Sequence, residues 1–306
     1  ASYGTAVGKS ALAANTTGAN NTGLGFKALT ANTTGAENTA SGVYALEDNT
    51  TGASLASFGA YALRDNTTAS ENSAFGKSAL MLNTTGAGNT AVGKDALRAN
   101  TTASNNVAVG LDALTTNTTG TNNVAVGAQA LDAAVTANDN TAVGHKALTT
   151  NTASSNTALG SEALQYNTSG NSNVGIGVQA LRANTTAINN TAVGSSALLA
   201  NTTASQNTAV GGRSQEATTT GSDNTSVGWG SLVLNTTGVN NVSLGRSSLA
   251  ANTTASNNTA VGYIALLSNT TGTQNTAVGS LAGDAITTGS GNAAVGYNAL
   301  GATTTA

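Results

Sequence analysis

The chain has 306 residues, of which 8% are charged and 3% aromatic, and it contains no proline and no cysteine. Its formal net charge is −3, and its ten Lys and Arg residues form no basic stripe, which disfavours nucleic-acid binding. No apolar run approaches the ~18 residues that a membrane span needs. The first residue is not Met and no signal peptide follows, so we expect either processing or a longer polypeptide.

A glycine recurs at a fixed interval along the whole chain. The eighteen positions are Gly8, Gly25, Gly42, Gly59, Gly76, Gly93, Gly110, Gly127, Gly144, Gly160, Gly177, Gly194, Gly211, Gly228, Gly245, Gly262, Gly279 and Gly296. Every step is seventeen residues, except for the sixteen between Gly144 and Gly160. Such a period is typical of stacked repeats. We therefore predict a single continuous array over residues 1–306, without separate domains.

The residues before each glycine alternate in character, as in Thr90-Ala91-Val92-Gly93. A period of two predicts a short strand with Thr90 and Val92 on one face and Ala91 on the other. We expect the glycine to end the strand because it needs a positive φ or leaves no room for a Cβ. In three successive coils, the structural positions of this motif are Asn89, Val92, Gly93, Asn106, Val109, Gly110, Asn123, Val126 and Gly127.

Three and four residues after the glycine, Ala or Ser is followed by Leu in sixteen of the eighteen coils, as at Leu97 and Leu114, and Gln215 and Gly283 are the exceptions. The next segment, Asn-Thr-Thr-Gly in many coils, is typical of a turn. We predict strand, turn, short strand or bend, and turn, which together make one coil of an all-β parallel β-solenoid. The alternative is one helical turn over Gly-x-x-Ala-Leu-x-x-Asn. At ~4.8 Å per coil, the coils would form a rod about 85 Å long, with Val, Leu and Asn each stacked on its equivalent.

The core of each coil is expected to be thin. Its sizeable apolar side chains stand directly before the glycine and four residues after it, and the rest are small. Ordering the backbone costs about 1–2 kcal/mol per residue, which so few apolar side chains do not offset. We therefore expect an oligomer, preferably a trimer. Its closest contacts should lie at the constant small residues two before and three after the glycine.

The motif Asn-Thr-Ala-Val-Gly-x-x-Ala resembles the head repeat of trimeric autotransporter adhesins (YadA-like heads). The longer unit, Asn-Thr-Ala-Val-Gly-x-x-Ala-Leu-x-x-Asn-Thr-Thr-Gly, also resembles arrays of phage tail-fibre-like and other extracellular fibre proteins. The resemblance covers essentially the whole chain. It implies trimeric, left-handed parallel β-rolls at a cell surface.

Residues that could carry catalysis are few and dispersed. The only histidine, His145, occupies a variable position, and an exposed side chain is the simplest interpretation. Asp95 and Asp112 share one position in neighbouring coils, which favours a surface pair over an acid–base pair. Gly-Gly-x-Gly-x-Asp calcium motifs do not occur. We expect no enzymatic activity, no cofactor and no metal.

Many of the turn asparagines are also N-glycosylation sequons. These are Asn15, Asn32, Asn49, Asn66, Asn83, Asn100, Asn117, Asn184, Asn201, Asn235, Asn252 and Asn269. The alternative is that these residues cap the turn or form a ladder, because the spacing already needs a turn residue there.

Two further surface functions are open. Regular threonine could bind ice, although adjacent Thr-Thr residues should point one inward and one outward. Aromatic residues one or two positions after the glycine could touch a receptor or another chain, and simple surface variation is the alternative. They are Phe26, Tyr44, Tyr61, Trp229, Tyr263 and Tyr297.

Two coils break the pattern, around 212–216 and 281–284, where the Leu and the turn Asn are lost together. Bulges, insertion points and lateral contacts are the possible explanations. Ala1 and Ala306 share the same position of the repeat and lack a polar cap. This predicts either a longer array or ends that stack into a filament.

Together these features predict an extracellular structural fibre or adhesin shaft at the cell surface, which attaches to surfaces or forms a filament. Its expected partners are further copies of itself and surface glycans, with no nucleic acid and no membrane-spanning segment. The alternative function is a monomeric ice- or polysaccharide-binding β-solenoid.

Overall fold

The computed structural model describes residues 3–305, so Ala1 and Ala306, with the prediction made from them, lie outside the described residues. The chain divides into two compact units, residues 1–154 and 155–306. Within residues 3–305, each unit contains nine three-residue strands. The first unit holds β1 (Thr5–Val7), β2 (Thr22–Leu24), β3 (Thr39–Ser41), β4 (Ala56–Phe58), β5 (Ser73–Phe75), β6 (Thr90–Val92), β7 (Val107–Val109), β8 (Val124–Val126) and β9 (Thr141–Val143). The second holds β10 (Thr157–Leu159), β11 (Val174–Ile176), β12 (Thr191–Val193), β13 (Thr208–Val210), β14 (Thr225–Val227), β15 (Val242–Leu244), β16 (Thr259–Val261), β17 (Thr276–Val278) and β18 (Ala293–Val295).

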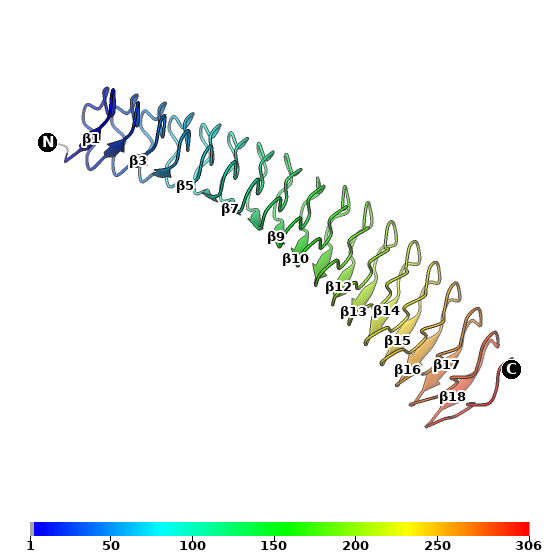
Figure 1. Cartoon of the computed structure of the whole chain (residues 1–306). Coiled ribbons are helices and arrows are strands. Elements are labelled where there is room, and N and C mark those ends of the chain that lie inside the picture. The colour runs from blue at the N-terminus through cyan, green and yellow to red at the C-terminus, as the bar shows by residue number, and fades with distance from the viewer. Residues whose placement is uncertain (1–2, 306) are drawn as a thin grey trace. The chain divides into compact units, whose positions relative to one another are not determined.

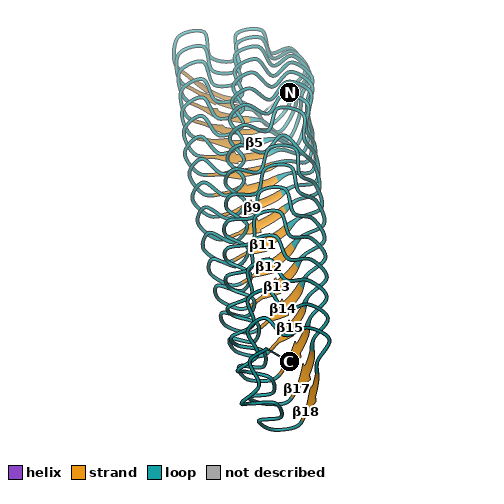
Figure 2. Ribbon diagram, turned by 90° about the vertical axis from the view of Figure 1, so that its right-hand side faces the viewer, coloured by secondary structure: helices purple, strands orange, loops and turns teal. Residues whose placement is uncertain are grey.

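Within each unit, every strand pairs in parallel with the next strand along the chain. The register joins equivalent residues, as in Thr90↔Val107 and Val92↔Val109. Within each unit, Figure 1 shows the strands following one another in chain order, and in Figure 2 turns and loops form the rest of each coil. The fold is therefore the predicted all-β parallel β-solenoid with about seventeen residues per coil. That the two units form a single array without separate domains stays a prediction.

The strands alternate as predicted, but the apolar residue before the glycine faces outward. In β6, Ala91 is fully buried, whereas the side chain of Val92 is 38% exposed. The interior beside the strand is occupied by the leucine of the preceding coil: a Cβ added to Gly175 would lie 3.3 Å from Leu164 Cγ. A small side chain is the one that fits there.

Two expectations about the core are therefore wrong. The valines before the glycines do not fill the interior, which contains leucine, alanine and asparagine side chains instead. Ala91 and Ala96, which represent the two positions of small residues, are both fully buried within their own chain. The close approach at these positions is between coils of one chain, so these residues do not form a contact between chains.

The segment after each glycine is a series of turns, with no helix and no second strand among residues 3–305. Asp95 and Leu97 both have left-handed backbone conformations, with φ of 56° and 50°. The Asp95 N–H donates to Lys77 O of the preceding coil, and the Leu97 N–H donates to Ala113 O of the following coil. The alternating backbone thus binds both neighbours, which excludes the helical turn. Leucine is rarely left-handed, and full burial of the Leu97 side chain opposes the cost.

The repeated glycine satisfies both reasons predicted for it. Gly110 has a φ of +141°, and a Cβ added there would lie 2.5 Å from Gly127 O. Its N–H donates to Val92 O of the preceding coil at 2.7 Å. The strand therefore ends where two backbones touch, and no other residue type fits this point without displacing the next coil.

The two irregular coils keep the register of the fold, since β13 and β17 pair with their neighbours residue for residue. Gln215 takes the leucine position and is fully buried, and its Nε2 donates to Ser226 Oγ at 2.9 Å. In the other coil, the Ile286 side chain lies beside the position that Gly283 leaves without a side chain. In the described residues these sequence changes produce no bulge or insertion, but they leave Thr218 Oγ1 and Asp284 Oδ1 buried without a hydrogen-bond partner.

Candidate functional site

The outer face of the strands carries two columns of side chains, three residues and one residue before each glycine. In β6 these are Thr90, which is half-buried, and Val92, which is exposed. No residue at either position in any coil is charged, because both columns contain only Thr, Val, Leu, Ile, Phe, Ala and Ser. We call this surface the Thr-Val face. An uncharged surface with an outward apolar column, whose described residues are exposed in some coils and half-buried in others, is unusual for an isolated soluble protein.

The apolar column contains a stacked aromatic pair in the first unit. The rings of Phe58 and Phe75, on β4 and β5, lie 5.0 Å apart with an angle of 4° between their planes. Both side chains are about 40% exposed. Stacking therefore covers one side of each ring but leaves the outer edges of the pair on the Thr-Val face.

The threonines of the Thr-Val face are not the ones of the Asn-Thr-Thr turns. In the turn, Thr101 Oγ1 donates to Thr118 O of the next coil at 3.1 Å, while the adjacent Thr102 is exposed. The two threonines of this turn therefore differ in exposure, as expected for adjacent Thr residues. This difference does not decide whether the chain binds ice. The outward threonine column that such a function needs lies on the strands.

The turn asparagines form an internal ladder. Asn100 Nδ2 donates to Asn83 Oδ1 at 2.7 Å and to Ala103 O at 3.0 Å. All the candidate sequon asparagines are fully buried except Asn15, which is partly buried and donates to Gly18 O. Burial of the amide nitrogen argues against attachment of a sugar to the folded chain, and glycosylation stays a prediction.

The asparagine four residues before the glycine forms a second buried ladder. The Asn106 N–H donates to Asn89 Oδ1 at 3.0 Å, and Asn106 Nδ2 donates to Gly120 O at 2.9 Å. Asn123 repeats both contacts one coil further on. These asparagines join neighbouring coils through their side-chain amides, and their structural role stays a prediction.

Aromatic side chains of the first unit pack on one another. The rings of Phe26 and Tyr44 meet edge to face at 5.3 Å, and Tyr44 stacks on Tyr61 at the same distance. Lys27 lies over this cluster and donates to Glu47 at 2.9 Å. That hydrogen bond to the carboxylate raises the pKa of Lys27. The rings of this surface cluster therefore contact one another, and Lys27 lies over them.

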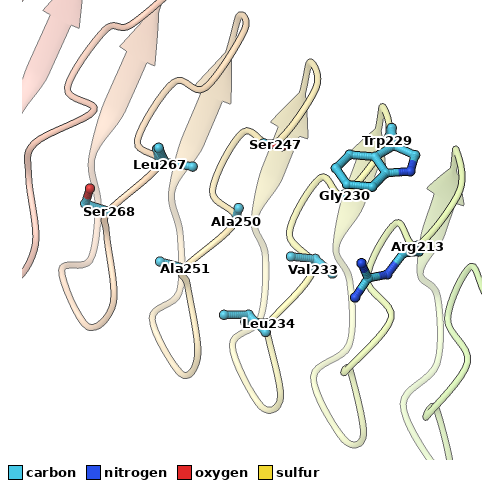
Figure 3. A pocket seen from close by; sticks show the side chains of 10 residues that line it. All are labelled: Arg213, Trp229, Gly230, Val233, Leu234, Ser247, Ala250, Ala251, Leu267 and Ser268. Carbon is cyan, nitrogen blue, oxygen red and sulfur yellow. The ribbon is translucent and has the colours of Figure 1, made fainter.

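The second unit contains an open groove of about 440 Å³ beside Trp229. Ala250 and Ala251 lie between the bulkier pair Val233 and Leu234 on one side and Leu267 on the other (Figure 3). Ala250 takes a position that Val233 and Leu267 occupy in the neighbouring coils, and Ala251 takes one that Leu234 occupies in the preceding coil, so less side-chain volume fills this part of the surface. Its lining is mostly apolar.

The titratable residues singled out from the sequence lie at the surface of the described chain. His145 is exposed, and Asp95 lies 3.3 Å from Lys94 and 3.8 Å from Arg98, as expected for surface residues. Burial, with a smaller contribution from the charge of Asp112, raises the pKa of Asp132. In the described part of the chain, no three His, Asp or Glu side chains are grouped so as to hold a metal ion.

Comparison with protein-family models, with curated proteins and with solved structures gives no match for this chain. Residues 3–305 contain no helix that could cross a membrane. The fold defines a parallel β-solenoid built of tandem repeats. Kinship with adhesin heads or phage fibres stays a prediction based on the repeat motif.

Proposed function

We propose that this chain is a non-enzymatic structural shaft of an extracellular fibre or adhesin, located at a cell surface. The observation that carries the proposal is the Thr-Val face, which presents outward apolar side chains along both units and has no charge. A regular solenoid supplies length and stiffness, whereas a catalytic site needs convergent polar groups. The resemblance to extracellular fibre repeats supports the same function.

We further propose that the shaft is a homotrimer in which the Thr-Val faces meet. A second copy has the same coil spacing, so its apolar column can match this one coil for coil over the whole length of a unit. The absence of charge on the face means that no ion must be desolvated when copies associate. Burial of one additional valine side chain per coil stabilises the assembly by about 1–2 kcal/mol before association costs.

Mass measurement by sedimentation equilibrium tests this assembly. We expect a single species of three times the chain mass at micromolar concentration. A strictly monomeric chain would overturn the trimer, and electron micrographs that show only compact globules would overturn the fibre. Attachment to surfaces is measured separately, by retention of the purified chain on cells and on immobilised glycans.

A second candidate function, ice binding by a monomer, is favoured by one observation on the same face. Outward Thr and Val columns lie about 6.6 Å apart along each strand and repeat about every 4.8 Å between coils. Such a rigid array of hydroxyl and methyl groups can order water, provided that the face is open. Thermal hysteresis of a monomeric preparation would support this function, and a trimer without hysteresis would exclude it.

A further inference from the structure

Three exposed aromatic side chains of the second unit occupy one position in alternate coils. Trp229, Tyr263 and Tyr297 each directly follow the repeated glycine, and each is two coils from the next. Trp229 and Tyr263 are 50% exposed and Tyr297 is 78% exposed. We call these three residues the aromatic row.

The spacing of the aromatic row is set by the sheet. Strands β14 to β18 pair in register, so that Val227, Val261 and Val295, two residues before the aromatic residues, lie in one column. Each coil advances by one strand spacing, and two coils therefore advance by about 10 Å. Equal steps at a constant position of the coil give a straight row.

The ring of Trp229 is held from both neighbouring coils. The guanidinium of Arg213 lies 6.0 Å from the ring centroid and that of Arg246 lies 5.5 Å from it. Gly212 leaves room for the indole, because a Cβ there would lie 3.3 Å from Trp229 Cδ1. Figure 3 shows the indole beside the open groove, with Arg213 next to it. This arrangement fixes the ring while half of its surface stays accessible.

We propose that the aromatic row binds an extended β-1,4-linked polysaccharide of glucose or N-acetylglucosamine, lying along the stacked coils. In such a chain alternate sugars are flipped, so the same face recurs once per disaccharide, at close to the two-coil interval. The C–H face of a pyranose ring is apolar and stacks on the electron-rich face of an aromatic ring. Every second sugar would therefore meet one aromatic residue.

The coils between the aromatic residues present polar groups at the same position. Arg246 lies between Trp229 and Tyr263, and Ser280 lies between Tyr263 and Tyr297. Both can donate hydrogen bonds to the hydroxyl groups of the intervening sugars. A helical α-linked glucan does not present equal faces along a straight line, so it should not bind. This proposal rests on the proposed function of attachment to surfaces, and it specifies a β-1,4-linked polysaccharide as the surface.

Binding of the full chain to insoluble cellulose and chitin, with starch granules as the α-linked control, tests the proposal. We expect binding to cellulose, chitin or both, and none to starch. Each of Trp229→Ala, Tyr263→Ala and Tyr297→Ala should weaken binding roughly threefold to tenfold, as expected for the loss of one stacked ring. Tyr166→Ala removes an exposed tyrosine outside the row, at a different position of its coil, and should leave binding unchanged.

A permuted variant tests the spacing itself. Tyr263→Ser combined with Ser280→Tyr keeps the number of aromatic residues but replaces two equal steps with three coils and one. We expect it to bind as weakly as Tyr263→Ala. Equal binding by the permuted variant and the natural chain would overturn the proposal, as would absence of binding to both polysaccharides. Sedimentation of the same preparations records the assembly independently, so failure of the trimer and failure of the aromatic row are distinguishable.

Discussion

Asn117 Nδ2 donates to Asn100 Oδ1 of the preceding coil at 2.9 Å and to Gly120 O of its own turn at 3.0 Å. One side-chain amide thus closes a turn and joins two coils. Both residues are fully buried, where an unpaired amide would be costly. The ladder therefore links the local turn chemistry of the sequence to the stacking of the repeats.

Removal of one ladder residue should destabilise the fold. Asn100→Ala leaves Asn117 without one acceptor and removes the donor to Ala103 O. We expect a loss of about 1–3 kcal/mol in the free energy of unfolding, measured by urea denaturation. Thr102→Ala, at the exposed residue of the same turn, is the matched control and should change the free energy of unfolding little. Equal effects of the two substitutions would contradict a ladder role.

Repair of a broken ladder should have the opposite effect. Thr218 stands where most coils have asparagine, and both its hydroxyl and Asn201 Oδ1 are buried without a hydrogen-bond partner. Thr218→Asn supplies an amide donor for Asn201 Oδ1. We expect a gain of about 1 kcal/mol in the free energy of unfolding. No gain in the urea midpoint would show that the turn of this coil does not accept the ladder geometry.

The repeated glycine should not tolerate alanine. Gly110→Ala places a Cβ 2.5 Å from Gly127 O at a φ of +141°, so the two coils must separate. We expect a loss of at least about 2 kcal/mol, measured by thermal or urea unfolding. Gly291→Asn is the control: its φ is +73°, nothing lies within 4 Å of an added Cβ, and Asn105 adopts a φ of 61° at the equivalent position. It should be nearly neutral.

The repeat predicts most of the fold because the period, the alternation in Thr90-Ala91-Val92 and the turn chemistry are local properties of the sequence. The direction of the alternation is not local. Whether Val92 or Ala91 faces inward depends on what fills the interior beside the strand, and a leucine of the preceding coil does so, as Leu164 does beside Gly175. Apolar character alone therefore assigned the valine column to the wrong side of the sheet.

The candidate binding surfaces were harder to predict for the same reason. The aromatic residues were visible in the sequence as scattered members of two variable positions. Their difference emerges from packing: Tyr44 and Tyr61 cover each other, whereas Trp229 and Tyr263 stand in alternate coils with accessible surface. A comparison at two-coil spacing would have found the row in the sequence alone.

Charge on the Thr-Val face should dissolve the proposed trimer without unfolding the chain. The double substitution Val109→Lys and Val126→Lys puts two ammonium groups on neighbouring outward positions of β7 and β8. We expect monomers by sedimentation, because an interface cannot bury unpaired charge, and unchanged far-ultraviolet circular dichroism. Val109→Thr with Val126→Thr keeps the face uncharged and should weaken the assembly less. A trimer that survives both lysines would place the interface elsewhere.

The carboxyl group of Asp132 should make stability depend on pH. Its pKa is raised by burial and then by Asp112, so the folded chain binds a proton at this group more readily than the unfolded chain does. The charged group therefore lowers the free energy of unfolding at neutral pH, and protonation relieves this as the pH falls. We expect Asp132→Asn to stabilise the fold by up to about 0.5 kcal/mol at pH 7.

Because Asp132 is protonated in both states only well below the ordinary Asp pKa of about 3.9, the advantage of Asp132→Asn should shrink as the pH falls through that value and disappear below it. Urea midpoints measured from pH 3 to pH 7 check this dependence. Asp112→Asn removes the neighbouring charge but not the burial, so its gain at pH 7 should be smaller than that of Asp132→Asn. Asn and protonated Asp have nearly the same shape, so the substitution should act through the charge alone and depend on pH. An effect of Asp132→Asn that is the same at every pH would instead indicate a change in packing.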